Sequence, residues 1–324
     1  MRWIVLLFSL LSVSAAQASA QCGGTDIRTS LPPADQAALT RASADTPYGE
    51  GNHWLASRGS QTIHVIGTMH LGDPRMDGPI ERLTPVIEAA DILLLEADKQ
   101  TEAELMAALA ERPEMILLDG TSLIELMPDD RWQMLAQAAR ERGIPPFMAA
   151  RFQPWYLSLM LALPPCMMAQ MKAKNGLDHR LMGIAEAAGV PTGSLEPFDT
   201  IFRVFGSEKL ETQVEMMTLG LVDPARAEDV FASTTALYFE EQTAASWELS
   251  RLTAEIPAEQ RDALFAQMQQ ELLTQRNRSW LPVILEQEQA STLVVAVGAA
   301  HLPGQDGVLA LLAGAGFTLT RQPF

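Results

Sequence analysis

Two histidines follow two apolar segments of the same design. Residues 63–66 lead into Gly67-Thr-Met-His70, and residues 294–297 lead into Gly298-Ala-Ala-His301. Each segment has the pattern of a buried strand followed by G-x-x-H, and glycine permits a sharp exit from the strand and close approach of the backbone. Side chains just beyond the carboxyl ends of parallel strands face the crevice where ligands bind, so we expect the two histidines to meet. Neutral imidazole serves there as a metal ligand or a base.

A glutamate completes this candidate site. Residues 92–95 read Ile-Leu-Leu-Leu, a buried strand, and Glu96 follows directly. A carboxylate in that position needs a partner, which is either a metal ion or a basic side chain, unless the strand end is solvated. The sequence thus predicts that His70, His301 and Glu96 hold a divalent cation that lowers the pKa of bound water and polarises a carbonyl. Glu96 could instead take the water's proton.

Five further polar residues could support this site, and four of them also have an ordinary structural explanation. Asp73 stands three residues after the first histidine and could ligate, orient or simply form a turn. Asp178 opens a predicted helix, where N-capping is the common role, although the position could face the cleft. Glu196 follows a short predicted strand. Arg276 could bind a substrate carboxylate or stabilise an oxyanion, and Asn277 adjoins it; an exposed helix face is the alternative.

The N-terminal residues and the two cysteines indicate export. Residues 1–20 have a basic start, an apolar run and the small residues Ala18-Ser-Ala20, which predicts a signal peptide cleaved after Ala20 and a periplasmic or secreted protein. An uncleaved anchor is the alternative, although the apolar run is short for a bilayer span. In an oxidising compartment, Cys22 and Cys166 are expected to form a disulfide rather than remain two free thiols. No other segment predicts a membrane span.

Composition narrows the possible partners. The 324 residues include 23 basic and 40 acidic residues, a net charge of −17, and 48% are apolar. A packed core is therefore expected, and an electrostatic grip on nucleic acid is not. The sequence contains no G-x-S-x-G, H-E-x-x-H, G-x-x-x-x-G-K-[ST] or C-x-x-C motif, so the common hydrolase, zinc, nucleotide and redox signatures are absent.

The pattern along the chain predicts an α/β fold with a central mixed, mostly parallel sheet flanked by helices. A hairpin is expected around Arg58-Gly-Ser60, strands at 92–95 and 292–297, and a strand–helix–strand crossover at the C-terminus. A short strand is expected after Gly189. We predict a tail at 21–50 and one domain at 51–324, with a helical insertion at about 101–290.

These segments together resemble the TraB/GumN family, whose relatives include the Tiki metalloproteases and, more distantly, erythromycin esterases and ChaN-like haem-binding proteins. The resemblance covers the whole mature chain and rests on the two G-x-x-H segments, the strand-end glutamate and three landmarks between them (residues 65–70, 298–301, 94–96, 176–178, 195–196 and 276–277). It implies an α/β fold with duplicated halves. The Tiki branch implies a divalent-metal peptidase, commonly with manganese or cobalt, whereas erythromycin-esterase relatives imply a histidine base without an obligatory metal.

Three functions are therefore in competition. The first is a metal-dependent hydrolase, peptidase-like, acting on a peptide or a small ester; manganese, cobalt, zinc and iron all suit two histidines plus a carboxylate. The second is a hydrolase that uses a histidine as general base without a metal. The third is a non-catalytic periplasmic protein that binds haem, a metal or a peptide in the same cleft. The sequence predicts neither the physiological substrate nor the oligomeric state.

Overall fold

The computed structural model describes residues 22–206, 208–220, 223–287 and 290–324. The predicted signal peptide and its cleavage site lie outside the described residues. The chain forms a six-stranded sheet in the order β4-β3-β5-β2-β1-β6. Its strands are β1 (His53–Arg58), β2 (Gln61–Thr68), β3 (Ile92–Leu95), β4 (Thr192–Ser194), β5 (Thr292–Gly298) and β6 (Thr318–Arg321). Strands β4, β3, β5 and β2 run parallel, and β1 is antiparallel to both neighbours, which confirms a mixed, mostly parallel sheet.

Local sequence signals explain most of the strand connections. Strands β1 and β2 form the expected hairpin, and Gly59 takes a positive φ of 61° in its turn, a conformation that glycine adopts without strain. The short strand after Gly189 is present as β4. The C-terminal crossover is also confirmed, since α16 (Val308–Gly314) carries the chain from β5 to β6 at the edge of the sheet.

Helices fill the two long connections, from β3 to β4 and from β4 to β5, so the predicted helical middle is present and β4 interrupts it. The helices are α1 (Pro33–Asp45), α2 (Asp77–Glu88), α3 (Lys99–Glu111), α4 (Leu123–Leu126), α5 (Asp129–Glu141), α6 (Pro146–Ala149), α7 (Pro154–Ala162), α8 (Met168–Ala173), α9 (Leu177–Ala188), α10 (Thr200–Phe205), α11 (Leu210–Leu219), α12 (Pro224–Phe239), α13 (Thr243–Thr253), α14 (Ala258–Gln269) and α15 (Gln275–Leu285), besides α16. A π-helical segment, η5 (Gln270–Thr274), joins α14 to α15 without a break.

Helices cover both faces of the sheet, so the buried strands are apolar on each side. In β5, Val295 and Val297 face one core with α15 and α16, while Val294 and Ala296 face another with α2 and α9. This alternation follows from the two-residue period of a strand. It explains why residues 293–297 are continuously aliphatic rather than alternating with polar residues.

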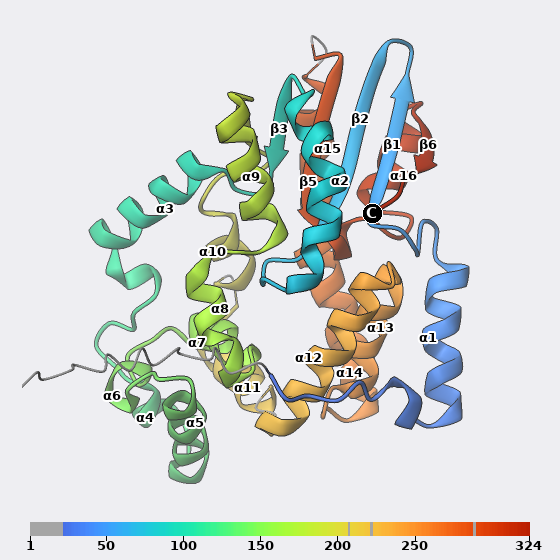
Figure 1. The fold of residues 1–324 in the computed structure, drawn as a ribbon. Helices are drawn as coiled ribbons and strands as arrows, with labels where there is room; N and C mark the ends of the chain where they lie inside the picture. The colour runs from blue at the N-terminus through green and yellow to red at the C-terminus, as the bar shows by residue number, and fades with distance from the viewer. Residues whose placement is uncertain (1–21, 207, 221–222, 288–289) are drawn as a thin grey trace, which may run out of the picture.

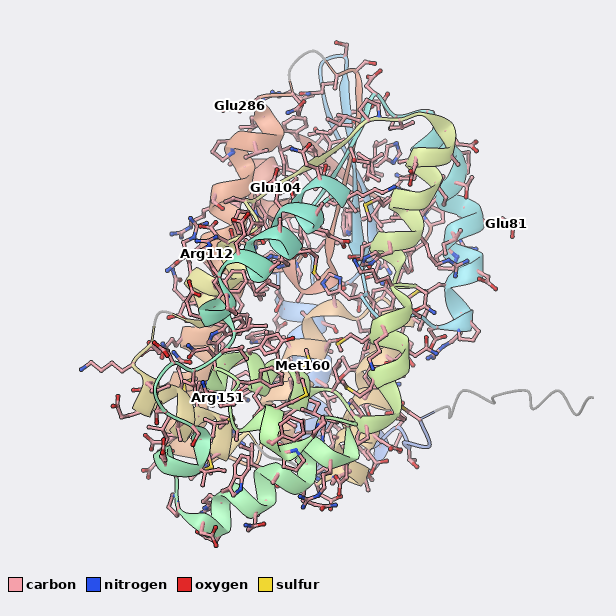
Figure 2. All side chains as sticks on the ribbon, turned by 90° about the vertical axis from the view of Figure 1, so that its left-hand side faces the viewer. Glu81, Glu104, Arg112, Arg151, Met160 and Glu286 are labelled. Carbon is pink, nitrogen blue, oxygen red and sulfur yellow. A yellow bond between two sulfur atoms is a disulfide. The ribbon has the colours of Figure 1, made fainter. Side chains whose placement is uncertain are left out.

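A separate group of helices extends beyond the sheet. Helices α4, α5, α6, α7 and α11 share their own core, which includes Leu123, Trp132 and Leu157. The group lies at the lower left of Figure 1, away from the strands. Figure 2 shows Arg151 and Met160 in this group, below the helix that carries Glu104. The sheet and the helical group therefore bury their apolar side chains in different cores.

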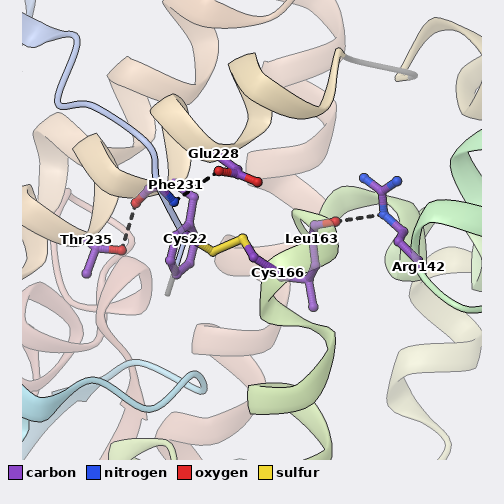
Figure 3. The surroundings of a disulfide bond; sticks show 8 residues. Cys22, Arg142, Leu163, Cys166, Glu228, Phe231 and Thr235 are labelled. Carbon is purple, nitrogen blue, oxygen red and sulfur yellow. Dashed lines mark hydrogen bonds between the residues drawn. A yellow bond between two sulfur atoms is a disulfide. The ribbon is translucent and has the colours of Figure 1, made fainter. Parts of the chain in front are cut away.

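The predicted disulfide is confirmed between Cys22 and Cys166, which are 144 residues apart in sequence. Figure 3 shows that it ties the N-terminal segment, which runs beside α12, to the turn after α7. Next to the bridge, the Gly23 N–H donates to Glu228 at 3.1 Å, and Arg142 Nε donates to the Leu163 carbonyl at 2.8 Å. Within the described residues, no helix has the length and apolar character that crossing a membrane requires.

Candidate functional site

The two G-x-x-H segments and Glu96 meet at the carboxyl ends of three inner strands of the sheet, β2, β5 and β3. Strands β2 and β5 pair in parallel with Thr68 opposite Gly298, and β3 pairs with β5 so that Leu95 lies opposite Ala296. The three strands therefore end side by side. A Cβ on Gly67 would lie 3.1 Å from Ala299, and a Cβ on Gly298 would lie 3.2 Å from Glu96 Oε1. Both glycines thus permit a close approach that a side chain would obstruct.

Arg276 lies at the centre of a polar cluster at these strand ends, with Glu96 and Glu196 on either side. Its Nη2 donates to Glu96 Oε2 at 2.6 Å and to Glu196 Oε1 at 2.7 Å, and its Nε donates to Glu196 Oε2 at 2.9 Å. The pairing with Glu196 is bidentate, the geometry that gives an arginine–carboxylate pair its strength and orientation. One guanidinium therefore holds two strand-end carboxylates together.

Helix α15 fixes the position of this guanidinium. Trp280 lies four residues after Arg276, so both side chains occupy one face of the helix. The Trp280 indole N–H donates to Glu196 Oε2 at 3.0 Å, and the guanidinium carbon lies 4.9 Å from the centre of the indole ring. Before α15, the π-helical turn brings the Leu272 carbonyl within 3.2 Å of Arg276 Nη1. Single π-helical turns often occur at functional sites.

His301 is buried beside this cluster as a neutral ring. Its Nδ1 lies 2.6 Å from Asn277 Oδ1, while Asn277 Nδ2 donates to the backbone carbonyls of His301 and Asp306. Because the amide oxygen only accepts, Nδ1 carries the proton and Nε2 keeps its lone pair. Burial lowers the pKa of His301 to about 4, against the raising effect of Glu96. Nε2 lies 3.3 Å from Arg276 Nη1 and 3.8 Å from Glu96 Oε1.

Glu96 is ionised in this setting. Burial alone would raise the pKa of its carboxyl, but interactions with His301 and Arg276 outweigh burial and lower the pKa to about 2. The backbone N–H of Gly298 adds a hydrogen bond of 2.7 Å to Oε1. Glu96 therefore keeps its negative charge at neutral pH, and Arg276 balances that charge.

His70 has the opposite environment. Its Nδ1 lies 3.0 Å from Asp178 Oδ2, and this hydrogen bond is the main cause that raises the pKa of His70 to about 9. The ring is 63% exposed, so solvent screens the interaction in part. Asp178 Oδ2 also lies 3.2 Å from His179 Nδ1, and that second histidine lies 2.9 Å from Glu102 through Nε2. Asp178 thus orients His70 and is not the N-cap of α9, which is Gly176.

Five of the polar residues, His70, Glu96, Asp178, Glu196 and Arg276, line one cleft of about 350 Å³. Its polar wall combines Glu96, Arg276 and Glu196 with His70 and Asp178. Its apolar wall includes Leu95 of β3, Leu105 of α3, Ile201 of α10 and Phe198 in the turn before α10. A few polar groups converging in an otherwise apolar hollow are typical of a ligand site. His301 lies behind this wall, with 5% of its side chain exposed.

Two of the predicted supporting residues, Asn277 and Asp73, have different places in the structure. Asn277 holds the His301 ring, whereas Asp73 lies outside the cleft, where it caps a short helical turn by accepting from the Arg75 N–H at 2.8 Å and pairs with the Arg75 guanidinium. Asp73 therefore has the turn-forming role that was its alternative explanation. Its side chain lines a separate surface hollow with Arg180.

The structure adds three residues that sequence reasoning missed. Trp280 orients Glu196, and the buried Tyr238 donates from its hydroxyl to the Gly67 carbonyl at 3.0 Å, which fixes the start of the first G-x-x-H turn. Thr68 also lines the cleft; it is 3% exposed, and its hydroxyl is among the buried polar atoms of the described residues without a hydrogen-bond partner. The four-residue spacing of Trp280 from Arg276 was the available signal; nothing in the sequence points to Tyr238.

Arg276 lies at the place where the predicted metal site would hold its ion. Nη2 of Arg276 occupies the space between Glu96 and Glu196, where a cation would balance both carboxylates. His70 and His301 contact Asp178 and Asn277 through Nδ1, which leaves Nε2 as the ring atom that could ligate a metal. Nε2 of His301 lies 3.3 Å from Arg276 Nη1. Within the described ranges, no group of three or more His, Cys, Asp or Glu side chains is placed to hold a metal ion. The guanidinium therefore supplies a positive charge between the two carboxylates.

Comparison with known proteins places the chain in a family. Residues 52–321 match the TraB/PrgY/gumN family. The chain is 25% identical over 272 residues to the uncharacterized protein YbaP of Escherichia coli (strain K12), which covers 81% of this chain and 94% of that protein. The uncharacterized protein YbaP of Shigella flexneri matches to the same extent. No solved structure shows a significant match. With the family match spanning both G-x-x-H segments, Glu96 and Arg276, the chain belongs to the TraB/PrgY/gumN family.

Proposed function

We propose that the chain is a hydrolase of peptide or ester bonds, exported from the cytoplasm, in which His70 takes the proton of the attacking water. The observation that carries this proposal is the pairing of His70 Nδ1 with Asp178 at 3.0 Å in a cleft that also contains Glu96 and Arg276. A carboxylate that accepts from Nδ1 fixes the tautomer of the ring, so that Nε2 can exchange a proton with a substrate or water.

The neighbouring charges complete the chemistry. Arg276 lines the cleft and is held in place by two carboxylates, so it offsets part of their negative charge beside the place where the substrate carbonyl would lie. Ionised Glu96 accepts a hydrogen bond from water and orients it. The raised pKa of His70 makes the ring a strong base, while lowering its neutral fraction at pH 7. Activity should therefore rise with pH toward about 9.

A metal-assisted version is a second proposal from the sequence, and it requires a rearrangement. Arg276 would have to leave Glu96 before this carboxylate could join His301 Nε2, 3.8 Å away, on a metal ion. A bound divalent ion would lower the pKa of its water and polarise a carbonyl. Manganese, cobalt and zinc are the ions to test.

The test is hydrolysis of peptide and ester libraries by the mature protein, with and without a chelator. His70→Gln should lower the rate by roughly 10²–10⁴-fold, the usual contribution of a general base. Asp178→Asn should also lower it, whereas Asp73→Asn makes the same chemical change outside the cleft and should leave it unchanged. Unaltered activity in His70→Gln would overturn the assignment of the base.

The remaining outcomes separate the competing functions. Loss of activity with the chelator, restored by manganese, cobalt or zinc, would replace the histidine-base mechanism by the metal-assisted one. No turnover of any substrate, together with stoichiometric retention of haem, metal or peptide after dialysis, would identify a binding protein instead. A purified protein whose melting temperature falls with chelation also carries a structural or functional metal.

A further inference from the structure

A second cavity of about 350 Å³ lies among the helices, outside the cleft. Its walls come from α7, α10, α11, α14 and η5, and aromatic rings and thioethers make up much of its lining (Trp155, Phe205, Phe265, Met216, Met217 and Met268). The volume is in the range of small-molecule sites, and thioether side chains adapt their shape to flexible aliphatic groups. The lining therefore favours an apolar ligand.

The charges around this cavity are negative. Among its described lining residues, the ionisable side chains are those of Glu208 and Glu271. Both carboxylates converge on one amide, since Gln267 Nε2 lies 3.2 Å from Glu208 Oε1 and 3.1 Å from Glu271 Oε1. Among the ion pairs of the described residues, none involves either carboxylate. Two like charges drawn together without a cation favour a ligand that supplies one.

From this combination we propose that the cavity binds an aliphatic chain that ends in a positively charged amine. The chain lies among the rings and thioethers, and the ammonium group lies at Glu208 and Glu271. A fatty acid of the same length would place its carboxylate against two others and bind poorly. The proposal goes beyond hydrolysis and does not depend on it, because none of these lining residues belongs to the cleft.

The cavity shares two structural elements with the cleft. On α10, Val204 and Phe205 face the cavity while Ile201 lines the cleft. On η5, Leu272 lines the cavity and its carbonyl accepts from Arg276 Nη1 at 3.2 Å. A ligand in the cavity therefore contacts a residue that helps to position the central arginine of the cleft.

Calorimetric titration of the full mature protein with octylamine, octanol and octanoate tests both halves of the proposal. Octylamine should bind most tightly and octanoate at least about tenfold more weakly, from repulsion by two carboxylates. Shortening the amine should weaken binding by about fourfold for each methylene removed, the value expected for burial of an apolar chain. Equal affinity for amine and carboxylate, no dependence on chain length, or no binding would each overturn the proposal.

Two variants locate the binding. Met216→Trp fills the cavity and should weaken octylamine at least about tenfold, whereas Met134→Trp, at an exposed position of α5 outside the cavity, should not. The double variant Glu208→Gln and Glu271→Gln keeps the side-chain shapes and should abolish the preference for amine over octanol. Retention of that preference would contradict the assigned place of the ammonium group, even where Met216→Trp fails to fold.

Discussion

The two strand ends that carry G-x-x-H place their histidines in opposite environments. His70, after β2, is exposed and pairs with the carboxylate of Asp178, which raises its pKa to about 9. His301, after β5, is buried and pairs with the amide of Asn277, and burial lowers its pKa to about 4. The two rings therefore have different protonation states at neutral pH, although their local sequences match.

The difference arises from the helices that supply the partners. Helix α9 brings a charged residue to the end of β2, and α15 brings an amide and Arg276 to the end of β5. When their environments drive the pKa values of two titratable groups apart, the two groups can take different proton-transfer roles in one site. The exposed end is therefore suited to exchange protons with a substrate, and the buried end is suited to hold charge in place.

Removing Arg276 should disrupt the ion pairs beside the buried His301 and produce the largest loss of stability among these variants. Arg276→Gln leaves the carboxylates of Glu96 and Glu196, with 16% and 14% of their side chains exposed, close together without a cation. We expect a loss of about 3 kcal/mol in the free energy of unfolding, as for other broken pairs that are largely buried. Urea denaturation measures this directly.

Arg278 is the matched control for that experiment. It lies two residues further along α15, and its ion pair with Asp306 spans 2.8 Å, but its side chain is 60% exposed. Arg278→Gln should cost less than about 1 kcal/mol, because water screens such a pair. Equal losses of unfolding free energy in the two variants would show that the ion pairs of Arg276 stabilise the fold no more than an exposed surface pair does.

Exchanging the amide for a carboxylate should make the buried end resemble the exposed one. Asn277→Asp places a negative charge 2.6 Å from His301 Nδ1, the relation that Asp178 has to His70. The pKa of His301 should rise by roughly 1 to 3, as expected for an opposite charge at this distance. Titration of the imidazole signals by NMR measures the change, and an unmoved His301 would show that burial alone sets its pKa.

The strands and their polar ends could be predicted because the information is local. The run at 92–95 and the two segments before G-x-x-H mark buried strands that end in Glu96, His70 and His301. The partners of these residues could not be predicted, because helices supply them from far along the chain: Arg276 is 180 residues from Glu96. The sequence accordingly could not show that Arg276 lies between Glu96 and Glu196, beside the predicted metal ligands.

The end of β2 also carries a polar side chain where the end of β5 has none, because Thr68 pairs in register with Gly298. Thr68 lines the cleft, and its buried hydroxyl has no hydrogen-bond partner among the described residues, so we expect it to bind a substrate atom or the attacking water that enters the cleft. Thr68→Val should lower kcat/KM by about tenfold, the usual value of one lost hydrogen bond, without lowering the melting temperature. Thr68→Ser should restore activity.

A control variant separates this role from a structural one. Ser43 in α1 also has a buried hydroxyl without a partner, but it lies outside the cleft. Ser43→Ala should therefore leave both activity and melting temperature unchanged. A clear loss of stability in Thr68→Val would show that the hydroxyl supports the fold instead of a ligand.

The smallest expected effect is the pH dependence of stability at the exposed end. Pairing with Asp178 raises the pKa of His70 from 6.5 to about 9, so its contribution is complete below pH 6.5 and disappears as pH rises through about 9. Because the ring is 63% exposed, the loss should stay below about 1 kcal/mol. Asp178→Asn should flatten this part of the curve and lower the pH at which activity levels off. If urea unfolding of the variant still loses the same stability over this range, a group other than His70 is responsible.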